Sequence, residues 1–258
     1  MVSRPARPAA TLQSFVLHRY DWSESSQIVD LFTREAGRVV VAARGAKRPT
    51  SQLRAVLMPF QRIAVSVSGS ARDEASAEVR NLRSAEWAGG IPVRGGDALL
   101  SGFYLNELLL RLLARDDPHP QLWDAYAATL GRLGGDDEAP ALRAFELVLL
   151  AETGHLPDLS RVTSTSEPVT GGRLYLLRPE AGLASAAADT PGGLDGAAWA
   201  AVQSAVASRD LDALRAACAA CEGALRRQLR QCLAYHLAGT TLHTRELVRD
   251  LQTLTAAR

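Results

Sequence analysis

The sequence predicts an α+β protein in which a small β-barrel precedes a mainly α-helical region. Two observations lead to this fold class. From Leu12 to about Glu86 the pattern is that of short strands, with apolar runs at Ile28–Phe32 and Val39–Ala43 and an alternation of period two at residues 63–68, whereas beyond residue 97 the apolar residues recur mainly at helical spacing. The turn-rich segment AGGIPVRGGD at 88–97 separates the two patterns, so we expect a domain boundary there.

The composition is that of an ordinary globular chain, but its charge is unevenly distributed. Of the 258 residues, 47% are apolar and 22% are charged. Residues 1–80 contain 12 basic and 7 acidic residues, a difference of +5, whereas residues 100–160 contain 4 basic and 10 acidic residues, a difference of −6. This asymmetry predicts a basic working surface in the first region. We find neither a signal-peptide pattern nor an apolar run of membrane-spanning length, so we expect a cytoplasmic protein with reduced thiols.

Five strands and one short helix are expected in the first region. The strands cover Leu12–Arg19, Gln27–Thr33, Arg38–Ala43, the alternation of Ile63, Val65 and Val67, and Ala77–Arg83. A helix over Ser51–Leu57, capped by Ser51 and closed by Pro59, separates the third and fourth strands. This order of elements predicts a five-stranded OB-fold β-barrel over residues 11–87, with an open five-stranded meander as the alternative. Residues 1–10 are expected to form a flexible arm.

The second region, residues 98–258, is expected to be helical around an irregular insert at 155–194. The predicted helices are Ala98–Ala114, Gln121–Leu133, Glu138–Thr153, Asp195–Ser208, Asp210–Cys221, Glu222–Ala238 and Thr244–Ala256. Within the insert, only Arg173–Leu177 has the pattern of a strand.

A cluster of positive charge beside the second and third strands is the strongest functional signal. Its members are Arg34, Arg38, Arg44, Lys47, Arg48 and Arg54, with one acid, Glu35, among them. Such a cluster on a barrel of this type indicates a groove for a nucleic-acid backbone, although a solvated barrel edge is the alternative. Tyr20 and Trp22 follow the first strand and are candidates for stacking on bases, whereas Phe15 and Phe32 lie in apolar runs and are expected in the core.

The thiols invite two other interpretations. Cys218, Cys221, Cys232 and His236 superficially resemble a zinc set, and Cys232 with His236 could serve a hydrolase. The spacing of Cys232 and His236 matches that of the leucines on the same predicted helix, which favours a core position. The glycines near Lys47 lack the Gly-Lys-Ser/Thr order of a phosphate loop. We therefore expect no metal and no cofactor.

Several longer motifs occur in a fixed order along the chain. They are IVDLFTREAGRVVVAARGAKR, LRAVLMPF, NLRSAEW, FYLNELLLRLL, LRAFELVLLAETGHLPDL and LRQCLAYHLAGTTLHTRELVRDL. Together they resemble the RecO family of bacterial recombination mediators, over nearly the whole chain from Leu12 to Leu251. The resemblance implies an N-terminal OB-fold, a C-terminal helical domain and a nucleoid-associated protein that is not an enzyme.

The resemblance also implies an activity and partners. It implies binding of single- and double-stranded DNA, annealing of complementary strands, and help in loading RecA onto strands coated by single-strand-binding protein (SSB). RecR and the C-terminal tail of SSB are the implied partners, and the six basic residues match the family's basic hairpin and loop. For the SSB tail, the candidate residues are Leu142, Arg143 and Leu149, because an apolar pocket rimmed by arginine suits that tail.

One departure from the family concerns a zinc module that many members carry in the insert. Residues 155–194 contain no cysteine, and Val162 and Thr165 stand roughly where the first pair would fall. We therefore expect the module to lack its metal and its loop to be held by packing alone. The alternative function, from another class, is an OB-fold protein-interaction scaffold without direct DNA binding.

Overall fold

The computed structural model describes residues 11–68, 79–90, 95–244 and 246–247. The chain forms two compact units. The first consists of Met1–Pro92 together with Leu113–Trp123, and the second of Val93–Leu112 and Asp124–Arg258. The expected arm at residues 1–10 and most of the helix expected at Thr244–Ala256 lie outside the described residues.

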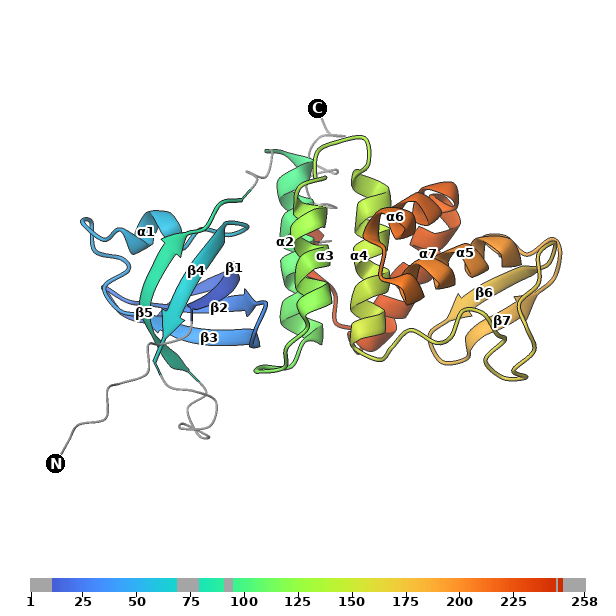
Figure 1. The fold of residues 1–258 in the computed structure, drawn as a ribbon, viewed down its shortest axis with the longest axis horizontal. Helices are drawn as coiled ribbons and strands as arrows, with labels where there is room; N and C mark the ends of the chain where they lie inside the picture. The colour runs from blue at the N-terminus through green and yellow to red at the C-terminus, as the bar shows by residue number, and fades with distance from the viewer. Residues whose placement is uncertain (1–10, 69–78, 91–94, 245, 248–258) are drawn as a thin grey trace. The chain divides into compact units, whose positions relative to one another are not determined.

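The first unit is built on a closed five-stranded barrel, so the α+β prediction with an OB-type barrel is confirmed and the open meander is wrong. The strands are β1 (Thr11–Asp21), β2 (Gln27–Thr33), β3 (Gly37–Ala43), β4 (Arg62–Val67) and β5 (Arg80–Trp87). Their order around the barrel is β1-β2-β3-β5-β4, and β4 closes it by pairing with β1 (Figure 1). All pairs are antiparallel except β3 with β5.

The barrel interior is filled by the alternate apolar residues of its strands. The buried cluster comprises Leu12, Val16, Val29, Leu31, Val39, Val41, Ala43, Ala46, Leu57, Ile63, Val65 and Val67. Burial of each Val, Leu or Ile side chain contributes about 1.5–3 kcal/mol of transfer free energy. Each strand therefore turns its apolar side chains toward the barrel interior. The turn between β2 and β3 is fixed by Thr33, whose hydroxyl donates to the Gly37 carbonyl at 2.9 Å and accepts from the Ala36 N–H at 3.0 Å.

Two barrel elements differ from expectation. The helix α1 spans only Leu53–Val56; Gln52 is at its N-cap and no side chain caps it, so the assignment of Ser51 as the capping side chain is wrong. Ser51 instead accepts a hydrogen bond from Arg54 through its backbone carbonyl. The fifth strand continues to Trp87 rather than ending at Arg83, because antiparallel pairing with β4 extends to the Trp87–Ile63 pair. The first residues predicted for it, 77 and 78, lie outside the described range.

The segment Leu113–Trp123 covers the outer wall of β1 and β2. The Trp123 ring packs on Phe15 with centroids 5.0 Å apart, and its Nε1–H donates to the Phe32 carbonyl at 3.2 Å. The Arg62 guanidinium lies 5.2 Å from the same ring. Phe15 and Phe32 are therefore buried as expected, but under this segment and not inside the barrel. The expectation that a helix continues to Ala114 is wrong, because α2 ends at Leu112.

The second unit is a helical bundle with a small sheet. Its helices are α2 (Asp97–Leu112), α3 (Pro120–Leu130), α4 (Glu138–Glu152), α5 (Gly196–Ser208), α6 (Leu211–Ala220) and α7 (Glu222–His236), of which α3 begins in the first unit. The ends lie within a few residues of those predicted. Asp195 and Asp210 cap α5 and α6 by accepting hydrogen bonds from backbone N–H groups of the first turn, as carboxylates at helix starts do. No described helix has both the length and the apolar character needed to cross a membrane.

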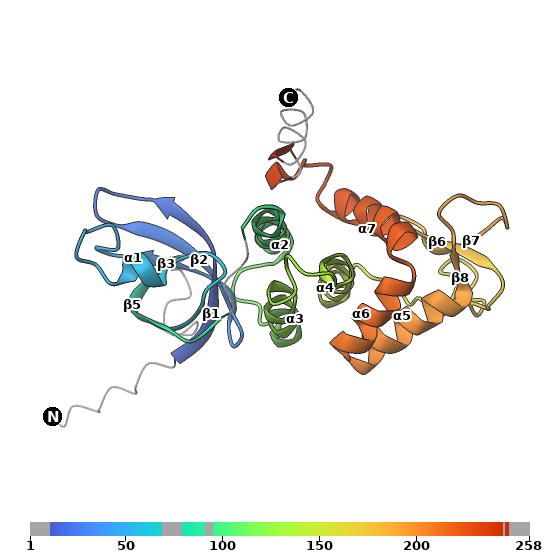
Figure 2. The ribbon, with the colours of Figure 1, turned by 90° about the horizontal axis from the view of Figure 1, so that it is seen from above.

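The insert between α4 and α5 contains a three-stranded sheet where one strand was expected. Its strands are β6 (Leu174–Arg178), β7 (Gly182–Ala186) and β8 (Leu194–Asp195), in the order β7-β6-β8. The sheet lies beside α7 (Figure 2). Gln228 of α7 accepts from the Leu177 N–H at 2.5 Å and donates to the Gly192 carbonyl at 2.8 Å, which fastens helix and sheet together.

Candidate nucleic-acid interface

A β-bulge in β1 turns Arg19 toward the end of the barrel interior. Val16 pairs with Leu31, but the register then shifts, so that Arg19 pairs with Val29. Directly paired residues face the same side of a sheet, and Val29 belongs to the barrel core. Arg19 therefore points to the interior side, whereas strict alternation from Leu12 would place it outside. The amino-acid pattern does not indicate this position of Arg19, because a bulge has no distinct mark in the sequence.

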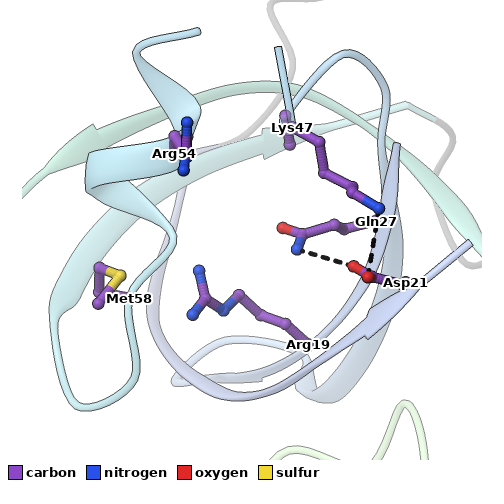
Figure 3. A pocket seen from close by; sticks show the side chains of 7 residues that line it. Arg19, Asp21, Gln27, Lys47, Arg54 and Met58 are labelled. Atoms are coloured by element: carbon purple, nitrogen blue, oxygen red, sulfur yellow. Dashed lines mark hydrogen bonds and ion pairs between the residues drawn. The ribbon is translucent and has the colours of Figure 1, made fainter. Parts of the chain in front are cut away.

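Arg19 lines a hollow of about 460 Å³ at this end of the barrel (Figure 3). Its other lining residues are Asp21, Gln27, Ala46, Lys47, Arg54 and Met58. In Figure 3 the Arg19 side chain extends from β1 into the hollow on the side of Met58. Three cations and one carboxylate leave the hollow with a net charge of +2, which suits an anionic ligand with an apolar portion.

The single acid of this hollow is committed to Lys47. The Lys47 Nζ lies 3.2 Å from Asp21 Oδ2, and the Gln27 amide donates to Asp21 Oδ1 at 3.3 Å. These hydrogen bonds, that of Gln27 first, hold the pKa of Asp21 below its usual range. Asp21 is therefore ionised at neutral pH and offsets Lys47. Among the described residues, Arg19 and Arg54 have no carboxylate within ion-pair distance, so these two arginines carry the excess charge.

A second hollow, of about 350 Å³, lies on the loops that follow β1 and β3. It is lined by Trp22, Ser23, Ser25, Ser26, Arg44, Gly45 and Arg48. Backbone hydrogen bonds join the two loops: Lys47 N–H donates to the Ser25 carbonyl at 3.0 Å, and Gly45 N–H donates to the Ser26 hydroxyl at 3.4 Å. Trp22 is 57% exposed, so its ring is available for stacking beside the two arginines.

These two hollows bring together four of the six predicted basic residues. We call the cations and the exposed ring that line the two hollows the barrel-end surface. It is defined by Arg19, Trp22, Arg44, Lys47, Arg48 and Arg54. Lys47 takes part in both: its side chain lines the first hollow, and its N–H joins the loops of the second. The surface thus presents five cations and one exposed aromatic ring at one end of the barrel.

Arg34 and Arg38 lie at the opposite end of the β2–β3 hairpin. The hairpin turn follows the Thr33–Gly37 pair, whereas Arg44 follows the Gln27–Ala43 pair. Seven residues of strand separate the ends by about 20 Å. Arg34 is exposed, but Arg38 is largely buried, with its Nε 2.8 Å from the carboxylate of Asp30 and its Nη1 donating to the Leu113 carbonyl at 3.3 Å. Through these two contacts, Arg38 holds β2, β3 and the segment at Leu113 together within the first unit.

Replacing Arg38 with alanine is expected to destabilise the first unit rather than to weaken an interface. The side chain of Asp30 is 3% exposed, and removal of its partner leaves a buried carboxylate without compensation, which costs about 3–5 kcal/mol. Urea unfolding of the Arg38→Ala variant measures this loss, and the exposed Arg34→Ala variant is the control, with an expected change under about 0.5 kcal/mol. Equal stability of the two variants would contradict the assignment.

Tyr20 does not join the barrel-end surface. Beyond the bulge it pairs with Ile28 and lies on the outer face, where its ring meets His18 edge to face with centroids 4.4 Å apart. Burial raises the pKa of Tyr20, and the charge of Asp30 raises it further. Asp30 is the partner of Arg38, so Tyr20 belongs to that outer side. Of the two predicted stacking residues, only Trp22 lies beside the cations of the barrel-end surface.

The residues predicted for the SSB tail do not line an open pocket. The Arg143 side chain is 9% exposed and pairs with Glu146 at 2.7 Å, Leu149 is fully buried, and Leu142 is partly buried. Another depression lies between α3, α4 and α6, which we call the helical hollow. It is lined by Ala125, Ala128, Thr129, Arg132, Ala141, Ala144, Phe145, Leu211, Asp212 and Arg215.

The thiols have the environment of core residues. Burial raises the pKa of Cys218 to about 12 and that of Cys232 to about 11. Both are therefore protonated at neutral pH, which is the opposite of what a nucleophilic or metal-binding cysteine requires. His236 stacks on His155 with centroids 4.0 Å apart. Across the part of the chain that the structure describes, no three His, Cys, Asp or Glu side chains come close enough to hold a metal ion.

The loop where relatives are expected to hold zinc is closed by hydrogen bonds as well as by packing. Val162 N–H donates to the Glu167 carbonyl at 2.8 Å, and Ser166 N–H donates back to the Val162 carbonyl at 2.8 Å. Thr163 N–H pairs with the Leu183 carbonyl on β7 at 2.8 Å. A buried Val162 and an exposed Thr165 do not fit a zinc site.

Comparison with known proteins places the chain in a family. Two family profiles match, "Recombination protein O N terminal" over residues 9–89 and "Recombination protein O C terminal" over residues 94–246. Proteins named "DNA repair protein RecO" from Polaromonas naphthalenivorans and Variovorax paradoxus are 52% and 48% identical to the chain, over 246 and 253 aligned residues. Each alignment covers 93% of this chain and 96% of the relative. The chain therefore belongs to the RecO family of DNA repair proteins.

Proposed function

We propose that this chain is a non-enzymatic mediator of DNA repair and recombination. In this proposal it binds single- and double-stranded DNA, anneals complementary strands and helps to load RecA onto SSB-coated single-stranded DNA. The observation that carries the proposal is the barrel-end surface, where five cations and the exposed ring of Trp22 adjoin two hollows. Guanidinium groups bond phosphate oxygens in pairs, and an exposed aromatic ring stacks on any base.

The physical role of these cations is to reduce repulsion between strands. Each phosphate that an arginine or lysine neutralises releases condensed counterions, which drives binding at low salt. Two complementary strands whose phosphates are partly neutralised approach each other with less electrostatic cost, so base pairing begins more readily. This function makes or breaks no covalent bond and calls for no nucleotide or metal cofactor.

The helical hollow is the better candidate for the SSB tail than the residues predicted from sequence. A peptide that ends in acids, an aromatic ring and a free carboxylate needs an apolar floor and a cationic rim. Phe145 and four alanines supply the floor, and Arg132 and Arg215 supply the rim, where a tail carboxylate would compete with Asp137 and Asp212 for them. Arg215 Nε makes no hydrogen bond to any described residue, but it is buried in this structure, so an acceptor reaches it only if the Arg215 side chain shifts. RecR is the further partner that membership of the family supports.

An annealing assay on complementary strands coated by SSB tests the proposed function. With the full chain present, we expect annealing to accelerate over the spontaneous reaction, and to accelerate less when the SSB lacks its C-terminal tail. Salt between 50 and 200 mM should reduce the effect, because binding rests on phosphate neutralisation. Failure of the chain to bind or anneal uncoated oligonucleotides even at 50 mM salt would favour a protein-interaction scaffold instead.

A further inference from the structure

The exposed face of α7 carries the densest group of unpaired cations in the second unit's described residues. Arg226, Arg227 and Arg230 are all exposed, whereas Leu225, Leu229 and Leu233 of the same helix are buried. At 100° per residue, the three arginines share one half of the helix surface with Gln231 and Tyr235. This half of α7 faces solvent, and the leucine side packs into the bundle.

The sheet of the insert contributes a fourth cation. Arg178, the last residue of β6, lines a hollow of about 480 Å³ together with Gln231 and Tyr235 of α7. Leu176, Pro179 and Ala181 supply apolar walls, and Glu180 is the one acid of the lining. The Tyr235 ring is 49% exposed at the edge of this hollow. Helix and sheet are held in register by the two hydrogen bonds of Gln228 described above.

These cations differ from Arg132 and Arg215 of the same unit in having no acidic partner among the described residues. Arg132 and Arg215 are engaged by Asp137 and Asp212 at 2.8–3.6 Å. No described carboxylate lies within 4.0 Å of the nitrogens of Arg178, Arg226, Arg227 or Arg230. The four arginines and Glu180 together carry a net charge of +3. They lie beside the exposed ring of Tyr235 and the hollow that it lines.

We propose that this α7 face, defined by Arg178, Arg226, Arg227, Arg230, Gln231 and Tyr235, is a second binding site for a single nucleic-acid strand. The arginines contact the phosphates, Tyr235 stacks on a base, and the hollow receives that base against Leu176 and Pro179. From Arg226 to Tyr235 the helix rises by about 13.5 Å, enough to follow several nucleotides. The inference rests on the proposed function for the identity of the nucleic acid as DNA.

Two separate sites give annealing a simple physical basis. One strand occupies the barrel-end surface, and the α7 face retains a second strand on the same molecule. The local concentration of the second strand then exceeds its concentration in solution, as for any two linked binding sites. An acidic protein segment is the other class of ligand that such a face attracts. The experiment below therefore also measures binding of an acidic peptide.

Sequential capture of two strands on the full chain tests this site. A biotinylated oligonucleotide is immobilised, the protein is bound and excess washed away, and a fluorescent oligonucleotide without complementarity is added. We expect wild type to capture the second strand. The Arg226→Glu/Arg230→Glu variant should bind the first strand within about threefold of wild type but capture the second at least about tenfold less. Arg161→Glu/Arg209→Glu, with the same charge change on exposed residues of the same unit, should behave as wild type.

The outcomes separate this inference from the proposed function. First-strand binding by wild type without second-strand capture, or equal capture by wild type and the α7 variant, overturns the second site alone. Absence of first-strand binding by wild type overturns the proposed function as well. Replacing the fluorescent strand with a fluorescent peptide of glutamates provides the last arm. Peptide capture that depends on Arg226 and Arg230, without strand capture, assigns the face to an acidic protein and overturns the inference.

Discussion

A variant carrying Arg44→Glu, Lys47→Glu and Arg48→Glu is expected to bind single-stranded DNA about 10²–10³-fold more weakly than wild type at 50 mM salt. Each tenfold change in affinity is about 1.4 kcal/mol, so this loss amounts to about 1 kcal/mol for each of the three groups, the size of a typical net hydrogen bond. The salt dependence should also become flatter. For single strands the slope of log K against log salt is about −0.7 per neutralised phosphate, so three lost contacts reduce it by about 2.

The matched control for this experiment lies on the same unit. The double variants Arg44→Glu/Arg48→Glu and Arg34→Glu/Arg115→Glu make the same change in net charge, and Arg34 and Arg115 are exposed residues at the other end of the β2–β3 hairpin. We expect the Arg34→Glu/Arg115→Glu control to bind with nearly the wild-type salt slope. Fluorescence anisotropy with a labelled oligonucleotide between 50 and 200 mM salt gives both the affinity and the slope. A wild-type slope for the barrel-end variant would show that these residues do not contact phosphate.

Replacing Gly37 with alanine is expected to lower the free energy of unfolding of the first unit by about 3 kcal/mol or more. Gly37 has φ of +69°, a conformation that costs an L-residue about 1–2 kcal/mol. A Cβ atom there would also collide with the backbone carbonyl of Asp117, which cannot move aside as a flexible side chain could. The collision would displace the segment that covers the outer wall of the barrel, adding an overpacking cost of about 1–3 kcal/mol.

Gly45→Ala separates the two contributions. Gly45 has nearly the same φ, +72°, but a Cβ there would make only ordinary contacts, 3.7 Å from the Arg48 side chain. We therefore expect this variant to lose only about 1 kcal/mol. Chemical unfolding combined with hydrogen exchange of peptides from β2 and β3 reports on the first unit in each variant. Losses of equal size would mean that the contact with Asp117 contributes nothing to stability.

The barrel was predictable because its determinants are local and repetitive. The alternation of Ile63, Val65 and Val67 indicates which face of β4 is buried in the barrel. The β2–β3 hairpin is marked by two apolar runs and the glycine of the turn between them. The membership of Arg44, Lys47 and Arg48 in one surface was also predictable, since residues so close in sequence on one loop remain close in space. The pairing of β7 was not, because the sequence GLASA lacks the β-branched and aromatic residues that mark strands.

The features that sequence reasoning missed depend on long-range contacts. Arg19 faces the hollow because of one shifted pairing with β2. Arg38 is not free to contact a ligand because it forms an ion pair with Asp30 on the neighbouring strand. Arg143 looked like a cationic rim, yet Glu146 one turn away binds it inside the bundle. Phe15 is covered by Trp123, which is more than a hundred residues away. A fragment that ends after β5 would therefore expose the outer wall of the barrel.

The hydrogen bonds that join the loops after β1 and β3 also affect the thermodynamics of strand binding. Because Gly45 and Lys47 are already tied to Ser26 and Ser25, the cationic loop has its shape before any ligand arrives. Ordering a loop or a long side chain on association usually costs conformational entropy, which subtracts from affinity. A preorganised loop avoids much of that loss. Most of the favourable free energy of the phosphate contacts therefore appears as affinity, even for a short oligonucleotide with few contacts.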